Sequence, residues 1–270
     1  MKKVMILGDT GLVGQAIIKQ LENKYKIYGI SRKKLENENW KHISFDLEKE
    51  NILEVLHDEK PEIIISCTRG DYKAQIETHK KIAEYSTESN AKVYYFSTVN
   101  VFDDDPNSIK FEDDKTCSKS DYGQFKIECE NLLIKELGDN VIIIRIPMVY
   151  GQNSLRVNEI RKVIEKLDLL VVYENMYFTT IFDTDLAIQL KYIIEKDLKG
   201  IFHLASKDII NYKDFYNKIL EDNTQFKLVG IENYEKYYFA IKTKRKELCD
   251  FQFSNDDVVH KIRRSIYNNN

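Results

Sequence analysis

The chain of 270 residues is poor in cysteine, proline and glycine, with 4, 3 and 10 of these residues. The four cysteines include no C-x-x-C spacing, and the five histidines form no H-E-x-x-H motif. A disulfide framework and a zinc site are therefore not expected. We expect no bound metal and a reducing, cytoplasmic location.

Positive charge and long hydrophobic runs are also lacking. The net charge of −3 provides no basic face for nucleic acid. No apolar run approaches the roughly 18 to 20 residues that span a membrane. The apolar stretch after Lys3 is interrupted at Gly8 and Asp9, too early for a secretion signal. We expect neither a nucleic-acid partner nor a membrane.

Three of the ten glycines fall within seven residues, at Gly8, Gly11 and Gly14. They follow the apolar run Val4–Leu7 and precede an amphipathic stretch over about 12–24. A strand, a glycine turn and a helix form an anion site, because the free N–H groups of the first helical turn face a phosphate. The alternative is a tight turn that only needs small residues. The turn predicts dinucleotide contacts from Gly8, Thr10, Gly11, Leu12, Val13 and Gly14.

Apolar strands alternate with helices through the first 151 residues. Strands are expected at 26–30, 42–45, 62–67, 92–98 and 141–147, and helices at 72–89 and 120–137. This alternation predicts an α/β fold with a Rossmann-type doubly wound parallel sheet. After residue 151 the alternation of strands and helices becomes irregular. This predicts a dinucleotide-binding core over 1–151 and a smaller mixed α/β substrate lobe over 152–270. Within that second part, we expect 183–204 to pack back on the core.

The end of the second expected strand bears on the choice of cofactor. After Gly29 the chain reads Ser31, Arg32, Lys33 and Lys34, without an acidic residue before position 36. NAD-binding folds place a carboxylate near here for the ribose 2′-hydroxyl, whereas Arg32 and Ser31 can hydrogen-bond a 2′-phosphate. The sequence thus favours NADP over NAD, with a solvated basic turn as the alternative.

A tyrosine and a lysine lie one helical turn apart at Tyr122 and Lys126. A lysine there would lower the phenol pKa, so that Tyr122 could exchange a proton with a carbonyl near neutral pH. The same spacing recurs by chance at 192/196 and 238/242. Position favours the first pair, because it follows a strand that ends in Ser97 and Thr98, at the ligand-binding edge of the sheet.

These motifs carry a family resemblance. The chain resembles the extended short-chain dehydrogenase/reductases, and most closely their dTDP-4-dehydrorhamnose reductase-like, sugar-nucleotide-binding branch. The resemblance covers most of residues 3–220 and is weak in the tail. It rests on the glycine turn, Ser97–Thr98 with Val101–Phe102, Tyr122 with Lys126, the run Arg145–Gly151, and the segments 184–187 and 200–204.

The resemblance implies a catalytic triad. Tyr122 would be the general acid, Lys126 would hold the nicotinamide ribose and tune Tyr122, and Thr98 would hydrogen-bond the substrate oxygen. Further cofactor contacts are implied for Asp46 and Leu47 at the adenine, Cys67 and Thr68 at the ribose, and Pro147 near the nicotinamide. A loop aspartate and a buried cysteine without such roles are the alternatives.

The substrate is less well defined than the fold. The small-residue stretch of the branch is replaced by residues 67–71, which include Arg69 and Asp71, and the loop 173–182 also differs. Candidate substrate contacts are Arg69, Val149, Arg156 and Arg161, although helical arginines are commonly just solvated.

The leading hypothesis is an NADP-dependent reductase of a keto group on a nucleotide-linked sugar. A nucleotide-sugar epimerase and a non-catalytic NADP-binding regulatory subunit are the alternatives. A dehydratase is disfavoured because Val99 and Asn100, rather than acidic residues, follow Thr98. A homodimer through helices 72–89 and 120–137 is left open.

Overall fold

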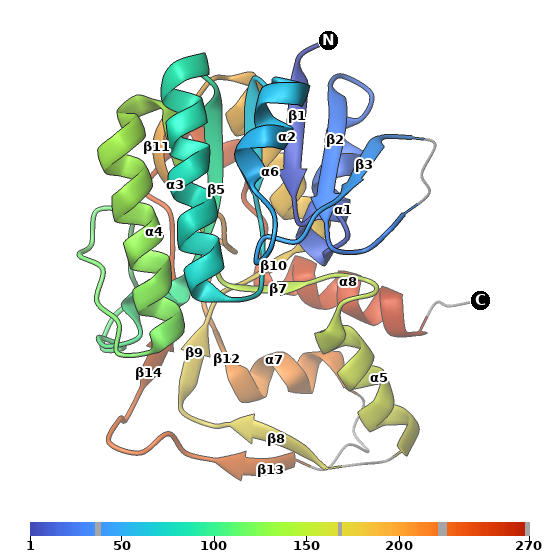
Figure 1. The fold of residues 1–270 in the computed structure, drawn as a ribbon. Helices are drawn as coiled ribbons and strands as arrows, with labels where there is room; N and C mark the ends of the chain where they lie inside the picture. Colours follow the sequence, from blue (N-terminus) through green and yellow to red (C-terminus); the bar gives the residue numbers. More distant parts are fainter. Residues whose placement is uncertain (36–38, 167–168, 221–225, 268–270) are drawn as a thin grey trace.

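A seven-stranded parallel sheet forms the centre of the molecule (Figure 1). The computed structural model describes residues 1–35, 39–166, 169–220 and 226–267. The strand order is β11-β6-β5-β4-β1-β2-β3, and every neighbouring pair is parallel. This confirms the predicted doubly wound α/β fold. The strands are β1 (Lys3–Leu7), β2 (Lys26–Ser31), β3 (Lys41–Ser44), β4 (Ile63–Ser66), β5 (Lys92–Thr98), β6 (Val141–Ile146) and β11 (Gly200–His203).

Helices cover both faces of the sheet, which is why its central strands are almost wholly apolar. Successive residues of β1 point to opposite faces, so Ile6 packs with Ile17 and Leu190 on one face, and Leu7 packs with Ile82 on the other. The first face carries α1 (Leu12–Leu21) and α6 (Asp183–Glu195), and the second carries α2 (Ile52–Glu59), α3 (Tyr72–Ser89) and α4 (Asp121–Leu137).

A smaller set of elements lies beyond the carboxyl edge of the sheet, in the lower half of Figure 1. Its core includes the buried side chains of Phe178, Phe215 and Val258. Two short strands, β7 (Met148–Tyr150) and β10 (Thr180–Phe182), pair with each other in parallel. The other elements are α5 (Leu155–Lys166), β8 (Leu170–Tyr173), β9 (Met176–Phe178), β12 (Ile210–Asn211), α7 (Tyr212–Ile219), β13 (Phe226–Val229), β14 (Tyr237–Phe239) and α8 (Asn255–Tyr267).

Later parts of the chain return to the sheet. Strand β11 pairs with β6, and α6 contributes Leu186, Leu190 and Ile193 to the same core as β1. The division of the chain at residue 151 therefore stays a prediction of organisation. Helices α7 and α8 and the strands of two or three residues were not predicted, because so short a segment has no readable period.

Element ends follow local chemistry. Helix α2 ends at Glu59, and the next residue, Lys60, adopts a left-handed conformation (φ 53°) just before Pro61. Helix α1 ends at Leu21, a turn earlier than predicted. In the described part of the chain, no helix has the length and apolar character needed to cross a membrane.

A buried ion pair fastens helix α4 to the sheet. Arg145 of β6 donates to Glu130 of α4 through Nε (3.1 Å to Oε1) and Nη2 (2.7 Å to Oε2). Both side chains are at most 4% exposed. Glu130 is two turns along from Tyr122, on the same face, so this pair sets the rotation of the helix that carries Tyr122.

Removing one partner of this pair should be costly. We predict that Arg145→Met lowers the free energy of unfolding by about 3–5 kcal/mol, because Glu130 is left as an unpaired buried charge. The double variant Arg145→Met/Glu130→Leu should recover most of that loss. Urea unfolding of the three proteins measures both effects, and a single variant within about 1 kcal/mol of the parent would contradict the prediction.

Candidate active site

The glycine turn brings the backbone of β1 and α1 into close contact. Gly8 has φ +91°, a conformation that side chains rarely adopt. A Cβ at Gly14 would lie 2.2 Å from the carbonyl oxygen of Gly8, so only glycine fits there. Gly11 caps α1 without using a side chain. Thr10, Leu12 and Val13 are half-buried around the first turn, whose N–H groups form the predicted anion site.

The basic turn after β2 lies at the same edge. Ser31 is paired with Ser44 of β3, and its hydroxyl is buried without a hydrogen-bond partner among the described residues. The side chain of Arg32 is 66% exposed and has Glu48 at 3.9 Å. The structure therefore offers an exposed guanidinium directly after the end of β2, as a bound phosphate would need.

Asp46 and Leu47 follow β3 beside this turn. The amide of Phe45 donates to the Ser31 carbonyl (2.9 Å), which keeps the two segments together. The pKa of Asp46 is lowered, mainly by a hydrogen bond from the Glu48 amide and then by Lys49. Asp46 is thus an ionised, partly exposed carboxylate near Arg32. Leu47 packs on the sheet.

The segment after β4 presents one free cation. Gln75 of α3 holds the loop by accepting from Thr68 Oγ1 (2.9 Å) and donating to the Gly70 carbonyl (3.0 Å). Arg69 between them is exposed and has no hydrogen bond or ion pair with any residue that the structure describes. Cys67 Sγ contacts the Leu7 carbonyl (3.1 Å), and burial raises the pKa of this thiol to about 12, so it is not a nucleophile.

Tyr122 lies in the first turn of α4, where the chain packs tightly. A Cβ at Gly123 would lie 2.5 Å from the carbonyl oxygen of Asn100, so the glycine allows α4 to approach the short helix Val99–Phe102. Asp103 at the end of that helix accepts from Ser118 Oγ (2.7 Å) and from the Lys119 amide (3.0 Å). These contacts place the first turn of α4 beside the end of β5, where the Thr98 hydroxyl affects the Tyr122 phenol.

The electrostatics of Tyr122 differ from the expectation. Burial raises the pKa of Tyr122, while the Thr98 hydroxyl and the charge of Arg69 lower it. The expectation that Lys126 lowers this pKa is wrong for this structure, because Lys126 points into the sheet. Its Nζ donates to the Phe96 carbonyl (2.8 Å) and lies 4.7 Å from the centre of the Tyr95 ring. Burial lowers the pKa of Lys126 to about 8.

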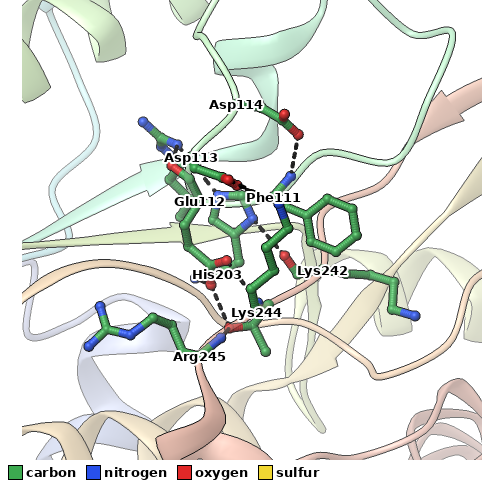
Figure 2. A network of polar contacts seen from close by, with 10 residues as sticks. Phe111, Glu112, Asp113, Asp114, His203, Lys242, Lys244 and Arg245 are labelled. Carbon is green, nitrogen blue, oxygen red and sulfur yellow. Dashed lines mark hydrogen bonds and ion pairs between the residues drawn. The ribbon is translucent and has the colours of Figure 1, made fainter.

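The loop between Thr98 and Tyr122 is tied to the C-terminal part of the chain (Figure 2). The Glu112 carboxylate accepts from the backbone amides of His203 (3.1 Å) and Lys244 (2.9 Å), and the Thr243 hydroxyl contacts it too. His203 Nδ1 lies 3.0 Å from the Lys242 carbonyl. The loop is therefore built into the fold, and Tyr122 is not carried by a free segment.

Two of the predicted substrate arginines have different surroundings. Arg156 lies near the buried phenols of Tyr150, Tyr212 and Tyr216, whose pKa values its charge lowers against a larger raising by burial. Arg161 of α5 instead donates to Asn158 Oδ1 on the same helix (2.6 Å) and to the Ser265 carbonyl on α8 (2.7 Å), which joins the two helices. The structure therefore does not bring Arg161 to the site as a free cation.

The smaller set of elements carries an open apolar hollow of about 450 Å³. Pro147, which is buried, and Val149, which is half-buried, are the chain neighbours of its lining residue Met148. The hollow is lined by Met148, Tyr173, Met176, Ile231, Tyr237 and Phe239. Such a surface suits a flat ring system, because aromatic side chains stack on it. Among the described residues, no cluster of His, Cys, Asp and Glu could hold a metal ion.

Sequence reasoning missed several residues that shape this site. Gln75, Asp103 and Glu130 position the loops and the helix, and the buried Asp9 lies inside the glycine turn. A charged residue between Gly8 and Gly11 was the one visible signal. The others act through contacts between segments far apart in the sequence, which no local pattern reports.

Comparisons with known proteins agree with this geometry. The NADP complex of dTDP-4-dehydrorhamnose reductase from Bacillus anthracis str. Ames is 20% identical, with a TM-score of 0.76, over 97% of this chain and 99% of that one. The NAD⁺ complex of WbmH from Bordetella bronchiseptica is 16% identical, with a TM-score of 0.83, over 100% and 99%. Methionine adenosyltransferase 2 subunit beta from Bos taurus is 24% identical over 77% of this chain and 68% of its own.

The sheet, the glycine turn and the Thr98/Tyr122/Lys126 set define a protein of the extended short-chain dehydrogenase/reductase class. Residues 1–252 match the RmlD substrate binding domain, and the chain belongs to that family. This confirms the predicted resemblance and, at the level of the family, the predicted class of NAD(P)-dependent oxidoreductases.

The charge of Arg69 gives a first test of the site. We predict that Arg69→Gln raises the pKa of Tyr122, because a positive charge that stabilises the phenolate is lost. NMR titration of protein with ¹³C-labelled tyrosine measures this pKa. Arg264→Gln on α8 is the control and should leave it unchanged; a lowered or unchanged Tyr122 pKa in Arg69→Gln would contradict the assignment.

We predict that the buried His79, which lies near Lys126, makes the protein less stable in acid. Its Nε2 lies 2.8 Å from Ser66 Oγ and its Nδ1 lies 2.6 Å from the Gln75 carbonyl, and burial lowers its pKa from 6.5 to about 4. Between these values the unfolded chain binds a proton that the folded chain does not. Stability should therefore fall as pH drops from about 6.5 towards about 4, by up to about 3 kcal/mol for this residue.

Thermal unfolding at several pH values checks this prediction. The slope over that range should be shallower in His79→Asn and unchanged in His260→Gln, whose parent side chain is exposed. An identical slope in all three proteins would show that His79 does not take up the proton.

Proposed function

We propose that this protein is an NADP-dependent reductase of a keto group on a nucleotide-linked sugar, with Tyr122 as the general acid. The observation that carries the proposal is the meeting of Tyr122 and Thr98 at the carboxyl edge of a sheet whose first turn has the glycine geometry that a dinucleotide site needs. Family membership and the reductase with NADP among its structural neighbours support the proposal.

The residues at the cofactor site fit NADP. The diphosphate would lie at the N-terminus of α1, where the glycines admit close approach. The 2′-phosphate would meet Arg32 and the unsatisfied hydroxyl of Ser31. Lys126 would hold the nicotinamide ribose, with Pro147 near the nicotinamide. Asp46, Leu47, Cys67 and Thr68 would flank the adenosine half.

The protein side of the reaction is proton transfer. Bound NADPH would supply a hydride to the carbonyl carbon, while Tyr122 donates its phenolic proton to the carbonyl oxygen. Since burial raises the pKa of Tyr122, the phenol is protonated at neutral pH and ready to donate. Thr98 would hydrogen-bond the same oxygen, and Arg69 would stabilise the phenolate that forms until solvent returns a proton.

The proposed substrate contacts lie mainly in the smaller set of elements beyond the carboxyl edge of the sheet. The apolar hollow would take the nucleotide base, and Arg156 would pair with the diphosphate. Val149 would line the passage between the hollow and the nicotinamide. The sugar ring then lies between the hollow and Tyr122, with Arg69 beside it. Homodimer formation through α3 and α4 stays a prediction.

The direct test follows NADPH absorbance with a panel of 4-keto nucleotide sugars. We predict turnover by the parent protein and a loss of at least about a hundredfold in kcat in Tyr122→Phe, with unchanged NADPH affinity. An epimerase would return the hydride, so products would form without net loss of NADPH. If no member of the panel gives NADPH-dependent reduction, the reductase proposal is contradicted.

Cofactor choice has its own prediction. Arg32→Ala should reduce the NADPH/NADH affinity ratio by about tenfold or more, because a charge-assisted hydrogen bond to the 2′-phosphate is lost. Binding titrations with each cofactor measure the ratio. The exposed Arg264→Ala is the control, and an unchanged ratio in Arg32→Ala would contradict the NADP assignment.

A second candidate is a non-catalytic NADP-binding subunit. It is favoured by the similarity to methionine adenosyltransferase 2 subunit beta, a protein named as a subunit. The presence of Thr98, Tyr122 and Lys126 together weighs against it, since a sensor does not need the phenol. NADPH binding without turnover on the whole panel would move the assignment to this candidate.

A further inference from the structure

A carboxylate is buried inside the glycine turn. Asp9 follows Gly8 directly and is 0% exposed. Its side chain extends across strand β2, where a Cβ at Gly29 would lie only 2.2 Å from Asp9 Oδ2. Gly29 therefore makes the space that the carboxylate occupies. Burying a carboxylate is unfavourable unless it is paired, so its partners are informative.

The partners of Asp9 come from the β3 segment. His42 Nδ1 lies 2.6 Å from Asp9 Oδ2, and Trp40 Nε1 donates to the same oxygen at 3.4 Å. The His42 side chain is only 3% exposed. Asp9 Oδ1 has no hydrogen-bond partner within the described ranges. The contact between Asp9 and His42 thus joins the glycine turn to β3 across the intervening strand.

The other ring nitrogen of His42 reaches the basic turn. Nε2 lies 2.5 Å from the carbonyl oxygen of Lys33, the residue after Arg32. Both neighbours of the ring are oxygens that only accept, so both contacts are hydrogen bonds when both nitrogens carry a proton. One side chain therefore connects the turn that would bind the diphosphate with the turn that would bind the 2′-phosphate.

We infer that Asp9 and His42 are positioning residues that hold the basic turn so that Arg32 meets the 2′-phosphate. The inference rests on the NADP site of the proposed function. If the turn that carries Arg32 were unrestrained, ordering it on binding would cost free energy and would weaken the affinity for the 2′-phosphate. A buried hydrogen bond to the adjacent carbonyl removes part of this cost before the cofactor binds. We expect the effect to be largest at the 2′-phosphate, because the Lys33 carbonyl that His42 contacts belongs to the residue next to Arg32.

The test compares two small probes, 2′,5′-ADP and 5′-AMP, by calorimetry with the full chain. The variant is Asp9→Ala/His42→Phe, which removes the link and leaves no lone buried charge. We expect the parent to prefer 2′,5′-ADP, and the double variant to lose about tenfold of that preference, with a clearly smaller loss of affinity for 5′-AMP. His203→Phe is the matched control, since His203 is also buried and also contacts a lysine carbonyl.

A conservative variant separates positioning from charge. Asp9→Asn can donate to Nδ1 of a neutral ring, which leaves Nε2 to donate to the Lys33 carbonyl. It should therefore retain the preference of the parent, and it covers the case in which the double variant does not fold. Loss of the preference in Asp9→Asn in a folded protein would overturn the inference.

The remaining outcomes are also decisive. A double variant that keeps the full preference for 2′,5′-ADP would overturn the inference but leave the NADP assignment standing. Equal losses for both probes would mean that the pair only stabilises the fold, which also overturns it. A parent protein without preference for 2′,5′-ADP would overturn the NADP assignment and this inference together.

Discussion

The close approach of Gly14 to the carbonyl of Gly8 is the constraint on which the rest of the structure depends. A Cβ at Gly14 would collide with that carbonyl. Because glycine has none, α1 can begin directly after the turn that ends β1, with its free N–H groups facing outward. The parallel sheet then brings the carboxyl ends of β2, β4 and β5 to the same edge. Arg32, Arg69 and Thr98 therefore lie at or just beyond that edge of the sheet.

The second constraint is the attachment of α4. Glu130 and Arg145 fix its rotation near the middle of the helix, and Gly123 and Asp103 fix its first turn. These contacts position Tyr122, together with the ring of Tyr72 (6.2 Å between ring centres). Its chemistry follows from its surroundings: burial keeps the phenol protonated, and Arg69 reduces the cost of the phenolate.

The sequence predicted the sheet, because strand and helix periods and turn glycines are local signals. It did not predict the direction of Lys126, since a one-turn spacing says only that two side chains share a face and not which carbonyl the longer one reaches. It also could not reveal that Asp9 crosses Gly29 to His42. That contact depends on register between strands, and the same holds for the short strands of the lobe.

The central claim is that a hydride moves from a nicotinamide to a sugar carbon at Tyr122. The most direct measurement supplies NADPH deuterated at C4, in each stereoisomer, with a 4-keto nucleotide sugar and examines the product by mass spectrometry. The account predicts a product one mass unit heavier with one of the two stereoisomers, and no such product in Tyr122→Phe. Bound NADPH that never delivers deuterium to any sugar of the panel would contradict it.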